Sequence, residues 1–264
     1  MRRSLLGLAG ILAVVSLLAP VASAESSLDA IRARGSLRVG VKTDAPPFGS
    51  STAGGRPAGF EIDLAEVFGR VLFDDARRVE LVPVTTATRF ELLTAGRIDL
   101  VIATITATEA RRAAMELSDP YFMSGSLVLV PRASQVRGLA ELAGRRVAVV
   151  RGSVQEQDVA ELQSRAIVTA VESAAEGAAS VTSGRADAFV YDDVMVVGLA
   201  QRDPALRVTG STFAARPYAI AARKGDTGLI RWVNGWLAKL RREGSYGTLW
   251  RRYFGPFESY LVGG

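Results

Sequence analysis

The chain has 264 residues, with 32 Lys and Arg against 27 Asp and Glu, and it contains neither Cys nor His. These absences exclude disulfides, thiolate chemistry and Ser-His-Asp triads, and they leave only oxygen ligands for a metal. We therefore expect neither a metal nor a cofactor. The arginines are scattered along the chain and form no basic block with interleaved aromatic residues, so the positive charge does not indicate nucleic-acid binding.

The first 24 residues have the three-part pattern of a secretory signal peptide. A basic start is followed by an almost entirely apolar run at 5–18 and by the small residues Ala22 and Ala24 of a cleavage pattern. The run is short for a membrane span, so an uncleaved anchor is the less favoured alternative. We expect cleavage near Ala24 and a periplasmic or secreted product.

Short apolar runs then alternate with amphipathic stretches. Strands are predicted at 37–41, 79–84 and 98–104, and helices at 63–72 and 89–96. The same order restarts further along, with strands at 145–150, 166–171 and 187–192 and helices at 153–164 and 174–184. Strands that alternate with helices predict βαβ units and a mostly parallel sheet, so the fold class is α/β.

A short match between two segments indicates that the halves are similar. Gly96-Arg97-Ile98-Asp99 precedes one predicted strand, and Gly184-Arg185-Ala186-Asp187 precedes the corresponding strand of the second half. We predict two α/β lobes, because the strand-like run at 124–132 leaves the first lobe and that at 216–226 returns to it. The first lobe is assigned residues 25–127 and 216–264, and the second is assigned 128–215. Two connecting segments suit hinge closure around a ligand.

Polar residues follow the predicted strands at the ends where ligands bind in open α/β sheets. They are Lys42 and Asp44 after the first strand, Thr104, Thr106 and Arg111 after the third, Gly152 and Ser153 after the fourth, and Asp192 and Asp193 at the last. Both signs of charge are present, as a small zwitterion requires. One of the two aspartates is expected to be only a helix cap, and the sequence leaves open which.

Arg111 lies early in a predicted helix, where the backbone dipole disfavours a cation. Thr106 and Glu109 have the spacing of a capping box, which predicts a helix start near Ala107. Arg111 would then lie near N–H groups that also attract an anion. The alternative is a solvated surface arginine, which is what we expect of Arg112.

Six segments resemble, in this order, the amino-acid-binding periplasmic proteins of ABC importers: LRVGVKTDAPPF, GFEIDLAEVF, IDLVIATITATEARRAAMELSDPYFMSG, LAGRRVAVVRGS, GRADAFVYDD and LWRRYFG. The resemblance covers nearly all of residues 28–255. Its most specific part is the Thr-x-Thr-x-x-x-x-Arg run followed by Ser-Asp-x-Tyr. It implies the type II periplasmic-binding-protein fold, in which two Rossmann-like α/β lobes are joined by two hinge segments.

The resemblance also implies roles for individual residues. Arg111 would pair with the α-carboxylate of an amino acid, Thr106 would contact its polar head, and Asp192 would take its α-ammonium. Thr104 would contribute main-chain contacts. The Gly152-Ser153 turn would offer N–H groups and a hydroxyl to the carboxylate.

The ligand's side chain is less defined. Relatives carry an aromatic residue over it, whereas here the corresponding loops are polar and Phe48 lies too far along. Lys42 and Arg89 are cations that suit a second carboxylate, and Asp44 suits an amide or a cationic side chain instead. We rank acidic ligands above amide ligands, and amide ligands above basic ones.

The resemblance implies a monomeric solute-binding protein that delivers an amino acid to an ABC permease, its only link to a membrane, and that is not an enzyme. The alternative is a prephenate- or arogenate-dehydrating enzyme on the same fold, for which Glu61 or Asp44 is the nominal general acid. Glu61 is more simply explained as part of a helix start. A detached sensory module is disfavoured, because no signalling domain follows.

Overall fold

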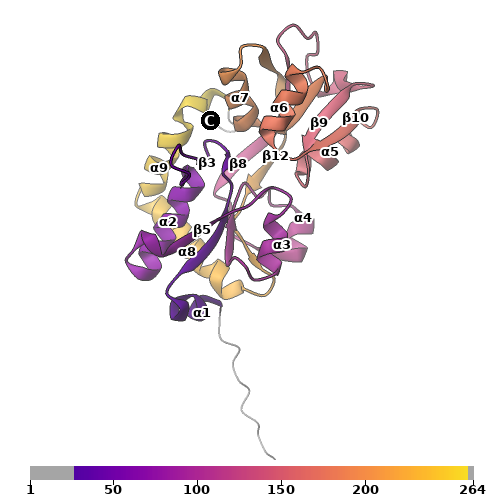
Figure 1. The fold of residues 1–264 in the computed structure, drawn as a ribbon. Helices are drawn as coiled ribbons and strands as arrows, with labels where there is room; N and C mark the ends of the chain where they lie inside the picture. Colours follow the sequence, from indigo (N-terminus) through magenta and orange to yellow (C-terminus); the bar gives the residue numbers. More distant parts are fainter. Residues whose placement is uncertain (1–26, 261–264) are drawn as a thin grey trace, which may run out of the picture.

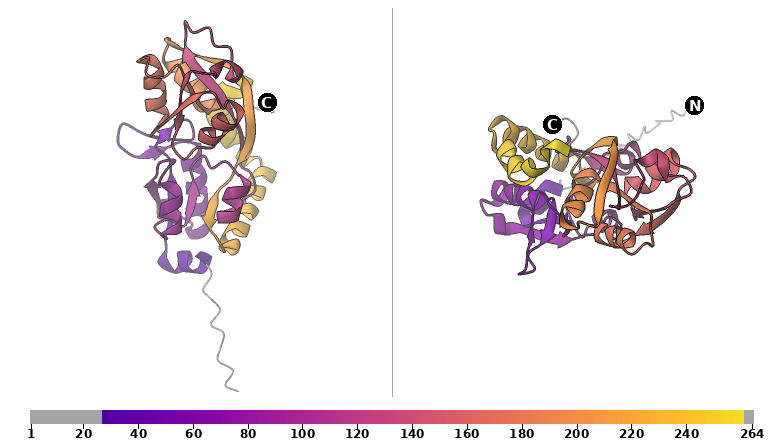
Figure 2. Two further views of the ribbon diagram at one scale, coloured as in Figure 1. Left: turned by 90° about the vertical axis from the view of Figure 1, so that its right-hand side faces the viewer. Right: turned by 90° about the horizontal axis from the view of Figure 1, so that it is seen from above.

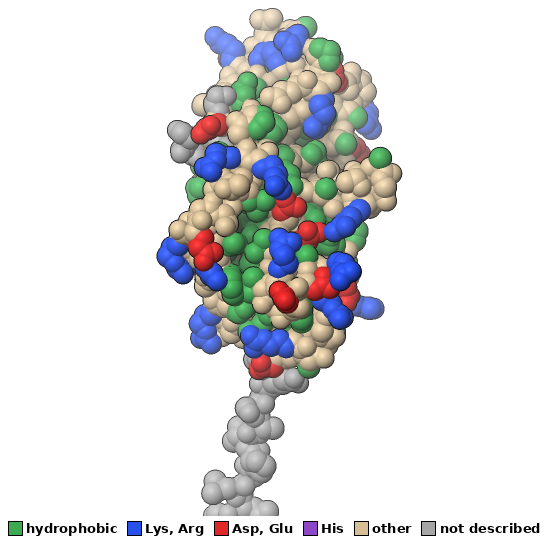
Figure 3. All heavy atoms as spheres, turned by 90° about the vertical axis from the view of Figure 1, so that its left-hand side faces the viewer, with side chains coloured by type: hydrophobic (Ala, Val, Ile, Leu, Met, Phe, Trp, Pro, Cys, Tyr) green, Lys and Arg blue, Asp and Glu red, His purple; other side chains and the backbone are tan. Residues whose placement is uncertain are grey.

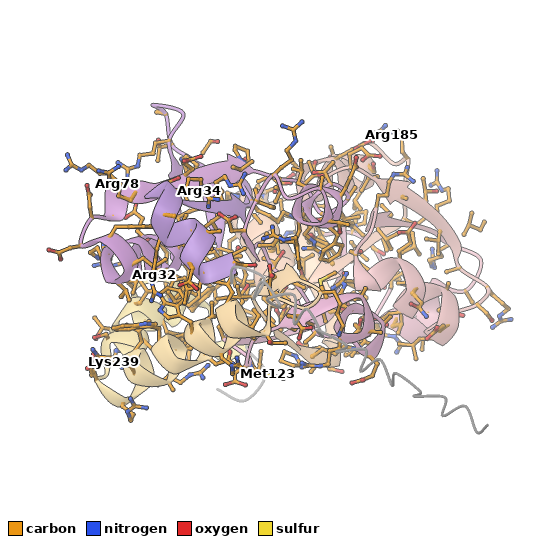
Figure 4. The ribbon with its side chains drawn as sticks, turned by 90° about the horizontal axis from the view of Figure 1, so that it is seen from below. Arg32, Arg34, Arg78, Met123, Arg185 and Lys239 are labelled. Atoms are coloured by element: carbon orange, nitrogen blue, oxygen red, sulfur yellow. The ribbon has the colours of Figure 1, made fainter. Side chains whose placement is uncertain are left out.

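The computed structural model describes residues 27–260, so the predicted signal peptide and its cleavage site lie outside the described residues. Within that range the chain forms two lobes, each built on a five-stranded sheet. Figure 1 shows that the early part of the chain and its last helices form one lobe together, and the middle of the chain forms the other. In Figure 4, Arg78 is labelled on the first lobe and Arg185 on the second.

The first lobe contains a mixed sheet of strand order β5-β1-β6-β13-β7. Its strands are β1 (Leu37–Val41), β5 (Val79–Pro83), β6 (Leu100–Ile102), β7 (Met115–Leu117) and β13 (Ala221–Arg223). Its helices are α1 (Ser27–Arg34), α2 (Phe60–Phe73), α3 (Arg89–Thr94), α4 (Glu109–Ala114), α8 (Thr227–Arg242) and α9 (Ser245–Phe254), with the 3-10 turn η1 (Ala76–Arg78). A small antiparallel sheet joins β2 (Asp44–Ala45), β3 (Gly49–Ser51) and β4 (Pro57–Ala58). The predicted parallel order holds for β1, β5 and β6.

The second lobe contains a sheet of order β10-β9-β11-β8-β12. Its strands are β8 (Phe122–Pro131), β9 (Arg146–Val150), β10 (Ile167–Val171), β11 (Ala188–Asp192) and β12 (Leu206–Tyr218). Its helices are α5 (Val154–Leu162), α6 (Ala174–Thr182) and α7 (Asp193–Arg202), with the 3-10 turn η2 (Leu139–Leu142). The 3-10 turn η3 (Gly255–Tyr260) near the end of the chain packs against α7.

Two long strands connect the lobes. β8 pairs with β12 along most of its length and with β11 from Ser126 onward. The chain returns to the first sheet through β13, which runs antiparallel to β6. The return predicted at 216–226 is therefore confirmed. The predicted lobe boundaries at 127/128 and 215/216 fall within β8 and β12 and stay a prediction. Figure 2 shows the two strands passing between the lobes.

The two segments that match in sequence, 96–99 and 184–187, occupy equivalent places in the two sheets. Asp99 accepts the backbone N–H of Arg38 at 2.9 Å and its guanidinium at 2.8 Å. Asp187 accepts the backbone N–H of Arg146 at 2.8 Å and its guanidinium at 2.7 Å. In each lobe an aspartate before one strand thus binds the arginine at the start of the neighbouring strand. The same aspartate–arginine pairing therefore occurs in both lobes.

An aromatic cluster fills the core of the first lobe where the crossing strands enter it. The Phe48 ring is fully buried and lies 5.0 Å from the rings of both Phe122 and Phe254. Phe48 therefore packs in the core and does not cover a ligand, as its position in the sequence predicts. Burying such a ring contributes roughly 2–3 kcal/mol to stability.

A glycine is required where the chain enters α2. Gly59 precedes α2 with φ 146°, and a Cβ there would lie 2.3 Å from the carbonyl oxygen of Phe48.

Charges on the outer surface are mixed. On the face drawn in Figure 3, basic side chains are interspersed with acidic and apolar ones. Among the described residues no helix combines the length and apolarity needed to cross a membrane.

Candidate functional site

The loops after the strands of the two sheets meet between the lobes. Lys42 Nζ, which follows β1, donates to the hydroxyl of Tyr191 at the end of β11, at 3.2 Å. Arg111 Nη2 donates to the carbonyl oxygen of Gly152, which follows β9, at 3.3 Å. The structure therefore brings predicted site residues of both lobes into direct contact. This is the edge at which open α/β sheets bind ligands.

Arg111 is held at the start of α4. The hydroxyl of Thr108 accepts the backbone N–H of Arg111 at 3.2 Å, so Thr108 is the N-cap and the predicted capping box at Thr106 is wrong. Thr106 instead forms an isolated bridge with Tyr218, and its carbonyl oxygen accepts Arg111 Nη1 at 2.8 Å. Pairing with a distant strand removes Thr106 from the helix turn. The guanidinium also lies 5.2 Å from the centre of the Phe90 ring.

Arg89 is almost completely buried, at 2% exposed. Its Nη1 donates to the carbonyl oxygens of Ala103 at 2.5 Å and Thr104 at 3.1 Å. Burial lowers the pKa of Arg89. Burial also lowers the pKa of Arg111, and the charge of Arg89 lowers it further, to about 9. Both side chains remain cationic at neutral pH, and a nearby anion would stabilise them.

Lys42 is 1% exposed, and its ammonium has three oxygen neighbours. Nζ lies 2.9 Å from Thr86 Oγ1, 3.2 Å from the Tyr191 hydroxyl and 3.5 Å from Asp44 Oδ1. Burial works against the charged form, but the fields of Tyr191 and Asp44 outweigh it, so the pKa of Lys42 is raised. Lys42 is therefore a buried cation that joins the lobes.

The two adjacent aspartates have different environments. Asp193 accepts the Ser124 hydroxyl and the Gly125 N–H, both at 2.9 Å, which ties α7 to the crossing strand β8. Asp192 stands at the N-cap position of α7 but its side chain makes no capping bond there. Burial raises the pKa of Asp192, although the Gln155 amide, which donates to its carboxylate at 2.9 Å, and the charges of Lys42 and Arg89 oppose the shift. Asp192 therefore does not tie α7 to β8 as Asp193 does, and its pairing with a ligand's ammonium stays a prediction.

The Gly152-Ser153 turn differs from its predicted role in one respect. The N–H of Gly152 donates to Glu156 Oε2 and that of Ser153 to the carbonyl oxygen of Val150, both at 3.0 Å. These N–H groups therefore already have acceptors within the second lobe. What the turn still offers is the Ser153 hydroxyl, which is buried and has no partner among the described residues.

Several buried polar atoms around these residues have no hydrogen-bond partner in the described part of the chain. They are Asp44 Oδ1, Glu61 Oε2, Arg89 Nε, Thr104 Oγ1, Ser153 Oγ and the Tyr218 hydroxyl. The Tyr218 hydroxyl lies near Asp192 without a hydrogen bond of good geometry to it. Leaving a buried donor or acceptor unsatisfied costs about 1–3 kcal/mol. Such a cost at several neighbouring groups indicates a site for a polar ligand.

Sequence reasoning missed the roles of Glu61, Thr86, Tyr191 and Tyr218. For a binding protein, Glu61 was expected to be part of a helix start, and it was the nominal general acid only under the enzyme alternative. It is instead fully buried, and its Oε1 accepts the Thr104 N–H at 2.7 Å and the Tyr121 hydroxyl. This bond supports Thr104 in a left-handed conformation, φ 50°. An acidic residue in a helix's first turn is common, so the sequence offered no signal of this burial.

Burial raises the pKa of Glu61 from 4.5 to about 7, although bonds from Tyr121 and Thr104 oppose the shift. The folded chain therefore binds this proton more tightly, and the free energy of unfolding should fall by about 3 kcal/mol as pH rises through that window. Glu61→Gln removes this titration. In urea unfolding without ligand, the variant should gain about 2–3 kcal/mol relative to wild type between pH 4.5 and 8. The pKa of Asp193, raised to about 6, affects both proteins and cancels in the difference. A difference that stays constant with pH would contradict the buried carboxyl.

Within residues 27–260 no group of three or more carboxylates is arranged to hold a metal ion. What the site offers is a set of cations, the Asp192 carboxylate and several hydroxyl groups, arranged between two lobes. This arrangement can bind a small zwitterion without covalent chemistry.

Comparisons with known proteins agree with this arrangement. Residues 37–256 match the family described as bacterial extracellular solute-binding proteins, family 3. The ABC transporter glutamine-binding protein GlnH of Bacillus subtilis (strain 168) is 32% identical over 233 residues, which are 88% of this chain and 85% of that relative. Among solved structures, a mutant of ArgBP from T. maritima is 30% identical with a TM-score of 0.81, covering 86% of this chain and 99% of that one.

A third comparison bears on the alternative of an enzyme. The ancestral amino acid-binding protein AncCDT-1, a precursor of cyclohexadienyl dehydratase, is 35% identical with a TM-score of 0.80, and the match covers 87% of this chain and all of that one. This relative is a binding protein, as are GlnH and ArgBP, so the chain is a binding protein and not an enzyme. Together the fold, the site and the family match identify the chain as an amino-acid-binding protein that belongs to the bacterial extracellular solute-binding proteins, family 3.

Proposed function

We propose that this protein captures an acidic amino acid, glutamate or aspartate, outside the cytoplasm and delivers it to an ABC permease. The observation that carries the proposal is the excess of buried positive charge. Lys42, Arg89 and Arg111 are cations of one site, in which Asp192 is the carboxylate proposed to pair with the α-ammonium. An amino-acid head group needs one cation and one anion. Of the other two cations, Lys42 has Asp44 beside it, so Arg89 is the cation left to match a second carboxylate on the ligand.

The charge balance decides among ligand classes. Asp44 offsets Lys42 at 3.5 Å, and the pKa of Glu61 near 7 makes that carboxyl a partial anion at most. Arg89 retains an unpartnered N–H that can only donate. A cationic side chain would lie beside Arg89 and Lys42, which disfavours arginine. A glutamine side chain would accept the same donors but leave the charge uncompensated.

The mechanism is lobe closure. A ligand that contacts Arg111 from the first lobe and Asp192 from the second favours the state in which both are in reach. Moving an equilibrium from mostly open to mostly closed takes a difference in affinity of roughly 10⁴-fold between the two states. We further propose that the first 24 residues are removed on export, that the protein acts as a monomer, and that the permease recognises the closed form.

Calorimetric titration tests the ligand class. The purified protein should be unfolded and refolded first, to remove any bound amino acid, and then titrated with glutamate, aspartate, glutamine and arginine. Tight one-to-one binding of glutamate or aspartate, with glutamine weaker by at least about tenfold, is expected because a charge-assisted bond is roughly twice as strong as a neutral one. Preferential binding of glutamine, the ligand named for the relative from Bacillus subtilis, would refute the acidic choice.

A further inference from the structure

Tyr191 joins the second lobe to the first through its hydroxyl. The side chain is 1% exposed, and its ring stacks on that of Phe189 with centroids 5.6 Å apart. The hydroxyl reaches across the lobes to Lys42 Nζ at 3.2 Å and to Thr86 Oγ1 at 3.4 Å. Lys42, Thr86 and Tyr191 are called the cross-lobe cluster below. Tyr191 also directly precedes Asp192, and the charge of Lys42 acts on the Asp192 carboxylate, so the cluster adjoins that carboxylate.

A count of donors and acceptors shows what the cross-lobe cluster can still bind. The Lys42 ammonium has three protons. It donates hydrogen bonds to the Thr86 and Tyr191 hydroxyls, and it forms an ion pair without a hydrogen bond with Asp44 Oδ1 at 3.5 Å. The two hydroxyl oxygens each accept from Lys42, and each carries one proton of its own. They lie close enough for one of them to donate to the other, but not for both to do so. One hydroxyl proton is therefore left over.

We propose that Tyr191 is a specificity-determining residue, which presents a hydroxyl donor to an oxygen at the end of the ligand's side chain and helps to hold the lobes closed. In this arrangement Lys42 acts through the two hydroxyls, because it donates hydrogen bonds to both of them and its remaining proton faces Asp44 Oδ1. The inference rests on the proposed function, since Tyr191 is the group that would bind the side chain of the captured amino acid.

The chemistry of the cross-lobe cluster selects the ligand. A hydroxyl whose oxygen accepts a hydrogen bond from a buried ammonium donates its proton most favourably to a carboxylate and less favourably to an amide oxygen. A ligand guanidinium or ammonium has no acceptor lone pair for this proton and is repelled by Lys42. Because the contact spans the lobes, its loss should act mainly on the rate at which the ligand leaves.

The test compares two Tyr→Phe variants in the full protein. Tyr191→Phe should weaken glutamate binding by roughly 10- to 100-fold, with most of the change in the dissociation rate, and should weaken glutamine binding less. The matched control is Tyr253→Phe, which removes a hydroxyl bonded to Asp63 in the first lobe and should leave both affinities unchanged. Thr86→Val, which removes the other hydroxyl, should weaken glutamate binding in the same way. Equal affinity of Tyr191→Phe and wild type for glutamate would overturn the inference.

A double-mutant cycle with Lys42→Met separates a shared role from two independent ones. If Lys42 acts through Tyr191, the double variant should lose clearly less affinity than the product of the two single losses. Independent, multiplicative losses would overturn the linkage. Wild-type preference for glutamine would refute only the acidic choice, and the same variants measured with glutamine would then decide the role of Tyr191. Tight binding of arginine, or of no amino acid, would overturn both proposals.

Discussion

Arg111→Ala is expected to weaken the binding of every amino-acid ligand by roughly 100-fold or more. The guanidinium is fixed by Thr106 and Gly152, one from each lobe, and truncating one partner of a buried charge pair costs about 2–5 kcal/mol. The loss should not depend on the ligand's side chain, since the α-carboxylate is common to all amino acids. Calorimetric titration with glutamate and with glutamine measures both values.

Two further variants test whether the loss is specific to the guanidinium of Arg111. Arg112→Ala is the matched control, because Arg112 is the neighbouring arginine and is exposed. It should leave affinity unchanged. Arg111→Lys keeps the charge but loses the planar fork, so it should fall between wild type and Arg111→Ala. Affinity retained by Arg111→Ala would refute the assignment of the α-carboxylate to Arg111.

Asp192→Asn is expected to weaken amino-acid binding by about 30- to 1000-fold, because it removes the carboxylate that would pair with the α-ammonium. Asn can still accept the Gln155 amide, so the fold should tolerate the change. Urea unfolding without ligand should show little loss of stability. Titration of the same protein should show the loss of affinity for glutamate and glutamine alike.

The adjacent aspartate provides the contrasting variant. Asp193→Asn weakens charge-assisted bonds from Ser124 and Gly125, so it should lower the free energy of unfolding by about 1–3 kcal/mol. Its effect on affinity should be small. If Asp193→Asn abolished binding while Asp192→Asn retained it, the roles of the two residues would be reversed.

The order of strands and helices could be predicted because local patterns encode it. The segments 37–41 and 188–192 are short apolar runs, and such runs predict buried strands from the residues within them. The same holds for the repeated aspartates Asp99 and Asp187, which bind equivalent arginines in the two sheets. The sequence therefore determined two similar α/β lobes and the loops in which charged groups gather.

Contacts between distant residues were decided only by the tertiary structure. Lys42 and Tyr191 are 149 positions apart, and a tyrosine in an apolar strand predicts burial rather than a hydroxyl bond to a lysine. Glu61 carries an ordinary helix-start pattern, and its burial follows from how α2 packs beneath Thr104. Thr106 has the spacing of a cap, but pairing with Tyr218 draws it into the sheet and leaves that role to Thr108.

The physical reason is the same in each case. Periodicity and capping act over a few residues, so they are visible in the sequence. The protonation, orientation and partners of a buried polar group depend on the field and donors of elements that approach it only when the chain is folded. The sequence determined which charged residues this protein places after its strands, and the packing of the two lobes decided which of them face one another.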